Sequence, residues 1–349
     1  MDYTVTLIPG DGIGPEVTEA AIKVLDASGV PLRWERVTAG ADAVAARGTP
    51  LPEEVLASIR RNRVALKGPI TTPVGTGFSS VNVALRKALD LYVSFRPVRT
   101  LRGVQSRHQD VDVIIVRENT EGLYAGREHS VVPGVVEALR IVTRRASERI
   151  ARWAFEMARR EGRRRVTLVH KASIMRLSDG LFLDSCRRVA QDYPFIECDD
   201  LSIDNTAMQL VLAPERFDVL VMENLFGDLM SDLCAGLVGG LGVVPGANIG
   251  DRCAVFEAVH GSAPGIAGRG IANPTALILS GVLMLRHLGQ HRAADAIARA
   301  VERVLAEGRV VTPDLGGTAG TMEMASEIAG HIQDQPERAG SSCQKMAPA

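Results

Sequence analysis

The chain has 349 residues, which is enough for one large domain or two smaller ones. Its net charge of −1 argues against a nucleic-acid partner, because binding nucleic acid needs a broad basic surface. No apolar run reaches the roughly 18 residues of a membrane helix, so no membrane partner is expected. The N-terminal residues lack the pattern of a secretory signal or transit peptide, and the five cysteines show no metal-ligand spacing. These features predict a cytoplasmic enzyme with reduced thiols.

The first third of the chain alternates between strand and helix patterns. Residues 3–8 predict a strand, a glycine-rich turn follows, and apolar residues at helical spacing predict a helix over about 16–28. A short strand at 63–66 leads to Lys67, and a loop rich in threonine and glycine (71–79) precedes a helix over about 81–90. Strands that alternate with helices indicate an α/β architecture.

The alternation continues along the rest of the chain. Further strands are expected at 112–117, 166–169 and 218–222. Further helices are expected near 144–161, 178–191, 274–289 and 293–307. The aperiodic residues 336–349 predict a mobile tail.

Residues 140–165 are rich in arginine. The interpretation preferred over a binding patch is a solvated helix face, because apolar positions accompany the charges. Those positions are Ile141, Ile150, Trp153, Phe155 and Met157.

Asp228 and Asp232 are four residues apart, so a helix places both carboxylates on one face. The residues that follow, 233–242, are nearly all small or apolar, and two like charges there would repel each other and be poorly solvated. A divalent cation bound by hard oxygen ligands, Mg²⁺ or Mn²⁺, would remove both problems. Two ordinary solvated aspartates remain the alternative.

Polar residues suited to a polycarboxylate recur between residues 80 and 117. Asn82 and Arg86 share a helix face, Arg96 follows in Phe95-Arg96-Pro97, and Arg117 lies at the end of the predicted strand 112–117. Arginines bind carboxylates through paired hydrogen bonds, although each of these could instead form an internal salt bridge.

Two further segments contain candidate catalytic or cofactor-binding residues. Lys171 follows a predicted strand and could act as a base, with Tyr124 as an acid, although a surface lysine is the simpler interpretation. The turn Gly10–Gly14 and the loop that begins at His260 could bind a nucleotide, but neither is specific alone.

Together these segments resemble the isocitrate and isopropylmalate dehydrogenase family over about residues 3–333, and among its members the NAD-dependent isocitrate dehydrogenases most. The resemblance rests on the joint occurrence, in order, of LIPGDGIGPE, KGPITTP, SSVNVALRKALDLYVSFRP, RENTEGLYAG, HKASIMRLSDGLF, NLFGDLMSDL and HGSAPGIAGRGIANPTALILS. It implies a two-domain α/β fold that is not a standard Rossmann fold. Residues 1–97 and 240–349 would form the large cofactor-binding domain, and residues 98–239 a small domain with the dimer interface and a clasp.

The resemblance also implies the role of each site residue. Tyr124, Lys171 and Asp204 would be catalytic. Asp228 and Asp232 would bind the metal together with Asp204 of the neighbouring subunit, and Lys171 would also cross that interface. The substrate-binding residues would be Ser80, Asn82, Arg86, Arg96 and Arg117. The cofactor-binding residues would be Ile13, Thr72, Asn82, Glu257, His260, Gly261, Ser262, Ala263, Pro264, Gly265 and Asn273.

Residues near the substrate and cofactor distinguish members of the family. Ser80 and Asn82 can bond the third carboxylate of isocitrate, whereas an isopropyl group would leave them unpaired. The position that is acidic in many NAD-dependent members is Gly265. The positions that are basic or tyrosine in NADP-dependent members are Pro313 and Gly317, so NAD is expected. Ser173 replaces the asparagine that many relatives carry.

The expected activity is therefore the metal-dependent oxidative decarboxylation of isocitrate to 2-oxoglutarate and CO₂, with reduction of NAD, in a homodimer or larger homo-oligomer with shared active sites. The alternatives are a dehydrogenase of homoisocitrate, isopropylmalate or tartrate, and a non-catalytic regulatory subunit.

Overall fold

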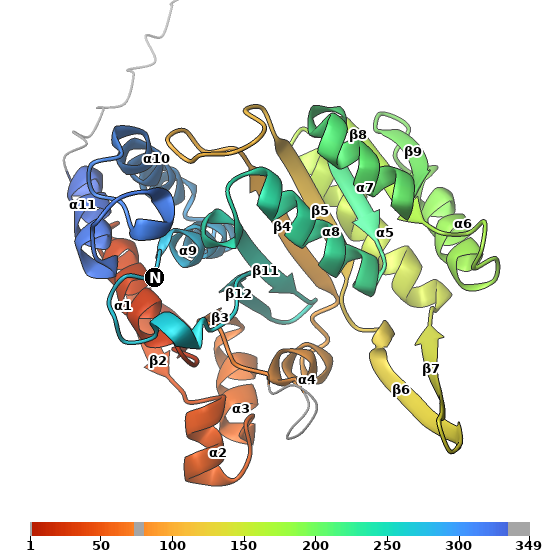
Figure 1. Ribbon diagram of the computed structural model, residues 1–349, viewed down its shortest axis with the longest axis horizontal. Helices are drawn as coiled ribbons and strands as arrows, with labels where there is room; N and C mark the ends of the chain where they lie inside the picture. The colour runs from red at the N-terminus through yellow and green to blue at the C-terminus, as the bar shows by residue number, and fades with distance from the viewer. Residues whose placement is uncertain (1, 73–79, 334–349) are drawn as a thin grey trace, which may run out of the picture.

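A computed structural model describes residues 2–72 and 80–333 (Figure 1). The predicted tail at 336–349 and most of the predicted loop at 71–79 lie outside these ranges. No helix in the described part of the chain is long and apolar enough to cross a membrane.

One sheet of ten strands runs through the whole molecule. In spatial order its strands are β2 (Leu32–Arg36), β1 (Tyr3–Ile8), β3 (Val64–Lys67), β12 (Ala254–Ala258), β11 (Pro245–Ile249), β4 (Val93–Arg99), β5 (Asp112–Glu118), β10 (Val219–Met222), β8 (Arg165–His170) and β9 (Glu197–Ser202). The pairs β12–β11, β11–β4 and β4–β5 are antiparallel and the other pairs are parallel. This mixed order confirms an α/β fold that differs from a standard Rossmann fold.

Helices cover both faces of the sheet, and central strands such as β10 are apolar on both sides. Within β10, Leu220 and Met222 face α8 and the large core, whereas Val219 and Val221 face α5 and α6. Successive side chains of a strand point to opposite faces, so a central strand must be apolar throughout. The helices are α1 (Gly14–Asp26), α2 (Ala41–Arg47), α3 (Glu53–Asn62), α4 (Val81–Ala88), α5 (Arg144–Arg160), α6 (Ser178–Ala190), α7 (Ile203–Leu212), α8 (Asn224–Leu237), α9 (Thr275–His287), α10 (His291–Glu307) and α11 (Thr321–Gln333).

A two-stranded hairpin stands apart from the large sheet. Its strands, β6 (Gly122–Val132) and β7 (Val135–Ile141), pair only with each other and extend away from the body of the molecule (Figure 1). We call this hairpin the arm. Several of its apolar side chains are exposed, and Val136 is 68% exposed.

The arginine-rich segment 140–165 was predicted to be a solvated helix face. It does contain a helix, but its first residues lie outside that helix. Helix α5 begins after Thr143, whose hydroxyl accepts a hydrogen bond from the backbone N–H of Ala146, and it buries Ile150 and Phe155. Ile141 lies instead on the arm and is 37% exposed. Arg140 also lies on the arm, but its side chain is only 12% exposed.

Candidate active site

Helix α4 presents two of the predicted substrate-binding residues. The Ser80 hydroxyl caps the helix by accepting a hydrogen bond from the N–H of Val83 at 3.5 Å. Val81 and Leu85 are buried against the core, which turns Asn82 and Arg86 toward a cavity of about 110 Å³. Other residues that line this cavity are Lys67, Ser94, Arg96, Asn248, Glu257, His260 and Gly261.

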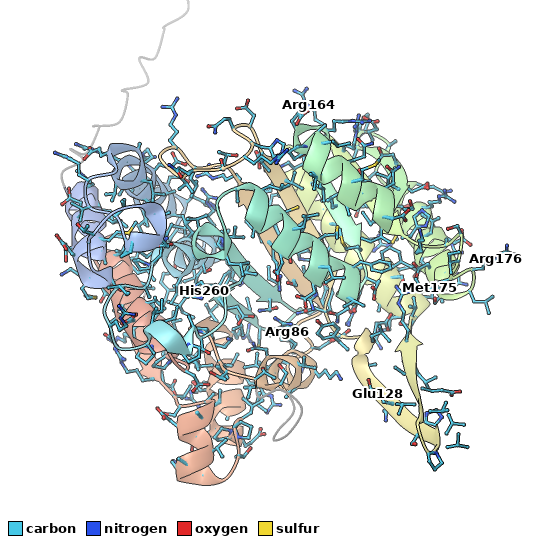
Figure 2. All side chains as sticks on the ribbon, viewed as in Figure 1. Arg86, Glu128, Arg164, Met175, Arg176 and His260 are labelled. Carbon is cyan, nitrogen blue, oxygen red and sulfur yellow. The ribbon has the colours of Figure 1, made fainter. Side chains whose placement is uncertain are left out.

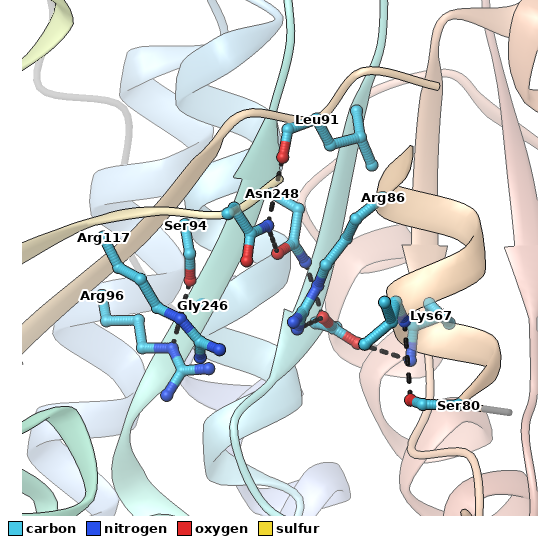
Figure 3. Close-up of polar contacts among 12 residues, drawn as sticks. Lys67, Ser80, Arg86, Leu91, Ser94, Arg96, Arg117, Gly246 and Asn248 are labelled. Atoms are coloured by element: carbon cyan, nitrogen blue, oxygen red, sulfur yellow. Dashed lines mark hydrogen bonds and ion pairs between the residues drawn. The ribbon is translucent and has the colours of Figure 1, made fainter. Parts of the chain in front are cut away.

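Glu257 holds the cationic side chains at one wall of the cavity. Its carboxylate contacts Lys67, lies 3.2 Å from Arg86 and accepts a 2.5 Å hydrogen bond from Asn248 (Figure 3). Burial alone would raise the pKa of Glu257, but Lys67 and Arg86 outweigh it and lower the pKa to about 2. Glu257, predicted to bind the cofactor, therefore reaches the cavity as a buried anion that orients Arg86.

Three arginines converge from different elements. Arg96 and Arg117 lie side by side on β4 and β5, and Arg86 points toward them from α4 (Figure 3). Burial, followed by the like charges of Arg96 and Arg86, lowers the pKa of Arg117 to about 10. The side chain of Arg117 is 1% exposed, so it cannot relieve this repulsion by turning to solvent. A cluster of this kind favours an anionic ligand.

Helix α8 brings Asp228 and Asp232 to the arginines, as their spacing predicts. Asp228 contacts Arg117 and accepts a hydrogen bond from the Tyr124 hydroxyl, and it lies 3.6 Å from Arg96. Asp232 lies 3.7 Å from Arg96 and is 57% exposed. The expected repulsion between two poorly solvated carboxylates is therefore offset largely by arginines of the same chain.

The two aspartates differ in their protonation equilibria. Burial would raise the pKa of Asp228, but Arg117 and the hydrogen bond from Tyr124 hold it below its usual value. Burial raises the pKa of Asp232, and the charge of Asp228 adds to this rise. Burial and Asp228 also raise the pKa of Tyr124, so its hydroxyl keeps its proton at neutral pH.

Two residues that the sequence reasoning missed fix the position of Arg117. The side-chain oxygen of Asn224 accepts hydrogen bonds from Arg117 Nε at 3.0 Å and Nη2 at 2.6 Å. A Cβ atom at Gly227 would lie 2.4 Å from Cγ of Arg117, so only glycine lets the arginine cross α8. Both residues belong to the motif NLFGDLMSDL, which could have drawn attention to them. Their contacts with Arg117, however, arise only because β5 packs against α8.

Lys171 and Asp204 form a separate pair. The Lys171 ammonium contacts the Asp204 carboxylate, and this hydrogen bond lowers the pKa of Asp204. Both side chains are open to solvent, at 29% and 64% exposure. Within the described residues, Asp204 does not join Asp228 and Asp232 in a group that could hold a metal.

The aspartates of α8 suit a hard divalent cation. Each offers carboxylate oxygens, and Asp232 is 57% exposed and lies 3.7 Å from Arg96. Two carboxylates leave most positions of such an ion free for other ligands.

Three loops meet beside the cavity. Ile13 N–H donates to the carbonyl of Ser262 at 2.9 Å, and the hydroxyls of Thr71 and Ser262 lie 2.6 Å apart. Asp11, which the sequence reasoning did not single out, accepts 2.9 Å hydrogen bonds from the N–H groups of Ala41 and Thr71. The glycine-rich turn and the loop after β12 are thus one assembly, although Ile13 and Ser262 are far apart in sequence.

Buried atoms without partners mark a space for a ligand in this assembly. Asn82 Oδ1 and His260 Nε2 are both buried and unpaired among the described residues. Arg86 and His260, which come from different segments (Figure 2), line the same cavity. Burial lowers the pKa of His260, so its ring is neutral, and because Nδ1 donates to the carbonyl of Gly261 at 3.0 Å, Nε2 is left as an acceptor. The predicted Thr72 donates to Ser80 at 3.3 Å. These groups fit the polar end of a nucleotide cofactor.

The outer part of the predicted cofactor site is more open. Asn273 donates to Asp314 at 2.9 Å, and the loop that contains Gly261, Ala263 and Pro264 continues to Gly265. A Cβ atom at Gly265 would meet nothing within 4 Å among the described residues, so this position is open. A Cβ atom at Gly317 would lie 2.0 Å from the carbonyl oxygen of Val311, so no basic side chain fits there.

Residues 4–328 match the model of the isocitrate/isopropylmalate dehydrogenase family. The chain belongs to this family. It is 54% identical to the mitochondrial catalytic subunit 5 of the NAD isocitrate dehydrogenase of Arabidopsis thaliana, over 94% of this chain and 88% of that protein. It is 53% identical to the chloroplastic 3-isopropylmalate dehydrogenase of Solanum tuberosum, over 87% of this chain and 86% of that protein.

Among solved structures, the isocitrate dehydrogenase of Methylococcus capsulatus matches with a TM-score of 0.92 and 54% identity, over 95% of this chain and 99% of that chain. Other matching relatives are named as mitochondrial subunits of NAD isocitrate dehydrogenase, one of them regulatory. These mitochondrial names contradict the predicted cytoplasmic location.

Proposed function

We propose that this family member is an NAD-dependent isocitrate dehydrogenase, which converts isocitrate to 2-oxoglutarate and CO₂ with a bound Mg²⁺ or Mn²⁺. The observation that carries the proposal is the charge balance around the cavity. Four cations, Lys67, Arg86, Arg96 and Arg117, face three carboxylates, those of Glu257, Asp228 and Asp232.

This balance favours a tricarboxylate over a dicarboxylate. Four positive and three negative side chains leave one positive charge, and a divalent cation raises that excess to three. Isocitrate carries three carboxylates and neutralises it, whereas isopropylmalate carries two. Asn82 also lines the cavity, where its side-chain N–H groups could donate to the third carboxylate of isocitrate, whereas an isopropyl group offers them no acceptor.

The metal ion would stabilise negative charge on the C2 oxygen of the substrate, and NAD⁺ would accept hydride from C2. Lys171 of the neighbouring subunit is proposed to take the proton of the C2 hydroxyl. Arg86, Arg96 and Arg117 would bind the carboxylates and fix which one is lost as CO₂. Tyr124, which keeps its proton at neutral pH, would donate to C3 after decarboxylation.

A homodimer with shared sites is proposed on two observations. Lys171 and Asp204 form an exposed pair that makes no contact with Asp228 in the described residues, so one chain supplies these groups at separate places. Exposed apolar side chains also gather on the arm and on α7 and α8. These are Val131, Val132, Val135, Val136, Leu139, Met208, Leu212 and Leu229. We also propose two domains, one of residues 1–97 with 240–349 and one of residues 98–239. In the sheet, the strands of the first proposed domain end at β4 and those of the second begin at β5, which supports this division.

NAD is proposed over NADP because Gly317 leaves no room for a side chain and Gly265 carries none. The decisive experiment measures initial rates with isocitrate, homoisocitrate, isopropylmalate and tartrate, each with NAD⁺ and NADP⁺ and with Mg²⁺ or Mn²⁺. The largest kcat/KM is expected for isocitrate with NAD⁺. A preference for isopropylmalate would overturn the substrate assignment. No turnover of any acid by the purified chain would favour a regulatory subunit.

A further inference from the structure

Arg140 lies at the base of the arm, where three elements meet. Its guanidinium contacts Asp179 at the start of α6 and lies 3.2 Å from Glu223 at the start of α8. All three side chains are nearly buried, with 12% exposure for Arg140, 2% for Asp179 and 7% for Glu223. A buried arginine between two buried carboxylates is costly to desolvate, and removing one member of such a network leaves an uncompensated buried charge.

One limb of this network reaches the turn of the proposed base. Asp179 accepts a 2.6 Å hydrogen bond from the backbone N–H of Lys171, and its own N–H donates to the carbonyl of Met175. Arg140 also lies 3.4 Å from the hydroxyl of Ser178. The backbone position of Lys171 therefore depends on where Arg140 holds Asp179.

The other limb reaches the helix of the proposed metal ligands. Glu223 is the N-cap of α8, and its Oε1 accepts a 3.0 Å hydrogen bond from the N–H of Phe226. Its second oxygen, Oε2, is buried and accepts no hydrogen bond among the described residues. Arg140 stacks at 5.1 Å over the Phe226 ring. The first turn of α8, which precedes Asp228, is thus fixed by a cap that Arg140 neutralises.

We propose that Arg140 is a positioning residue, which holds the Lys171 turn and the α8 metal helix in one arrangement through Asp179 and Glu223. The inference rests on the proposed function. In the proposed dimer, Lys171 serves the neighbouring site and Asp228 serves its own. Arg140 therefore joins groups of two active sites at the root of the arm.

The test separates the two limbs with conservative variants. Glu223→Gln keeps an oxygen that can cap α8 but loses the ion pair, so it is expected to weaken Mn²⁺ binding, titrated without substrate turnover, by about tenfold. Asp179→Asn keeps an acceptor for Lys171 N–H but loses its charge, so it is expected to lower kcat by about tenfold and to shift the acidic limb of the pH–kcat profile.

Arg140→Met is expected to show both effects, and Arg140→Lys to recover part of each. The matched control is Arg159→Met, which removes an arginine with 71% exposure at the end of α5 and is expected to leave both readouts unchanged. If the wild type and this control do not oxidise isocitrate, the proposed function fails.

Suppose that the wild type is active, that the Arg140→Met variant folds, and that the two agree within about twofold in kcat, KM and Mn²⁺ affinity. Only the present inference is then overturned. If Arg140→Met does not fold, the other two variants decide. Wild-type values for both Glu223→Gln and Asp179→Asn would overturn the inference.

Discussion

The two halves of the proposed catalytic machinery are built very differently. Asp228 has three partners in its own chain, Arg117, Arg96 and Tyr124. The Lys171 ammonium contacts the Asp204 carboxylate, and both side chains are open to solvent. A group that is held on several sides is already in place in one chain, whereas an exposed ion pair contributes little rigidity by itself. The difference supports the proposal that the α8 half is preorganised within one chain and that a second chain completes the lysine half.

The largest expected effect comes from breaking the preorganised half. Asp228→Asn should lower NADH formation by at least about a thousandfold, because stabilising the alkoxide charge with a metal is worth several kcal/mol. Initial rates measure the loss, and circular dichroism checks that the fold persists. Turnover of the wild type at full rate in excess EDTA would contradict the metal assignment.

The second prediction tests whether the lysine half belongs to a partner. Lys171→Ala and Asp228→Asn proteins should each be inactive, and mixing them should restore about a quarter of the wild-type rate. Half of the dimers in an equal mixture are hybrids, and each hybrid has one intact site of two. Absence of recovery, with subunit exchange demonstrated by differently tagged chains, would place Lys171 in the site of its own chain.

A smaller effect is expected from disturbing the support of Arg117. Gly227→Ala should raise KM for isocitrate by about tenfold or more, since its Cβ would lie 2.4 Å from the Arg117 side chain. Gly236→Ala on the same helix is the matched control, because a Cβ there meets nothing within 4 Å. Equal KM values for the two variants would show that Arg117 tolerates the displacement.

The smallest expected effect concerns stability at the wall of the cavity. The pKa of Glu257 is lowered to about 2 from 4.5, so its ionised form stabilises the fold above pH 4.5, and this contribution is lost as the pH falls toward 2. The melting temperature of Glu257→Gln should therefore lie below that of the wild type near pH 7, and the gap should narrow below pH 4.5. Thermal unfolding of both proteins between about pH 2 and pH 7 measures this difference in melting temperature. A difference that does not change with pH would contradict the charge argument.

Local patterns predicted the long elements well, because burial of one face leaves a periodic mark on the sequence. Helices α5 and α6 and strands β5 and β8 begin and end within a residue or so of their expected bounds. Strands β2, β4, β9, β11 and β12 and the two strands of the arm were not predicted, because the tendency to form a strand depends on its pairing and packing more than on its local sequence. The predicted cytoplasmic location was wrong because amino-acid composition carries little information about the compartment of a protein.

The sequence by itself determined which residues are available for chemistry, because spacing on a helix fixes which side chains share a face. Asn82 with Arg86 and Asp228 with Asp232 follow from the helical period alone. Only the tertiary structure decided their surroundings. It paired Glu257 with Lys67, made Gly227 necessary for Arg117, and buried Arg140 between Asp179 and Glu223. The reason is physical: the charge balance and close contacts of a buried group are set by elements far away in sequence, and no local pattern encodes them.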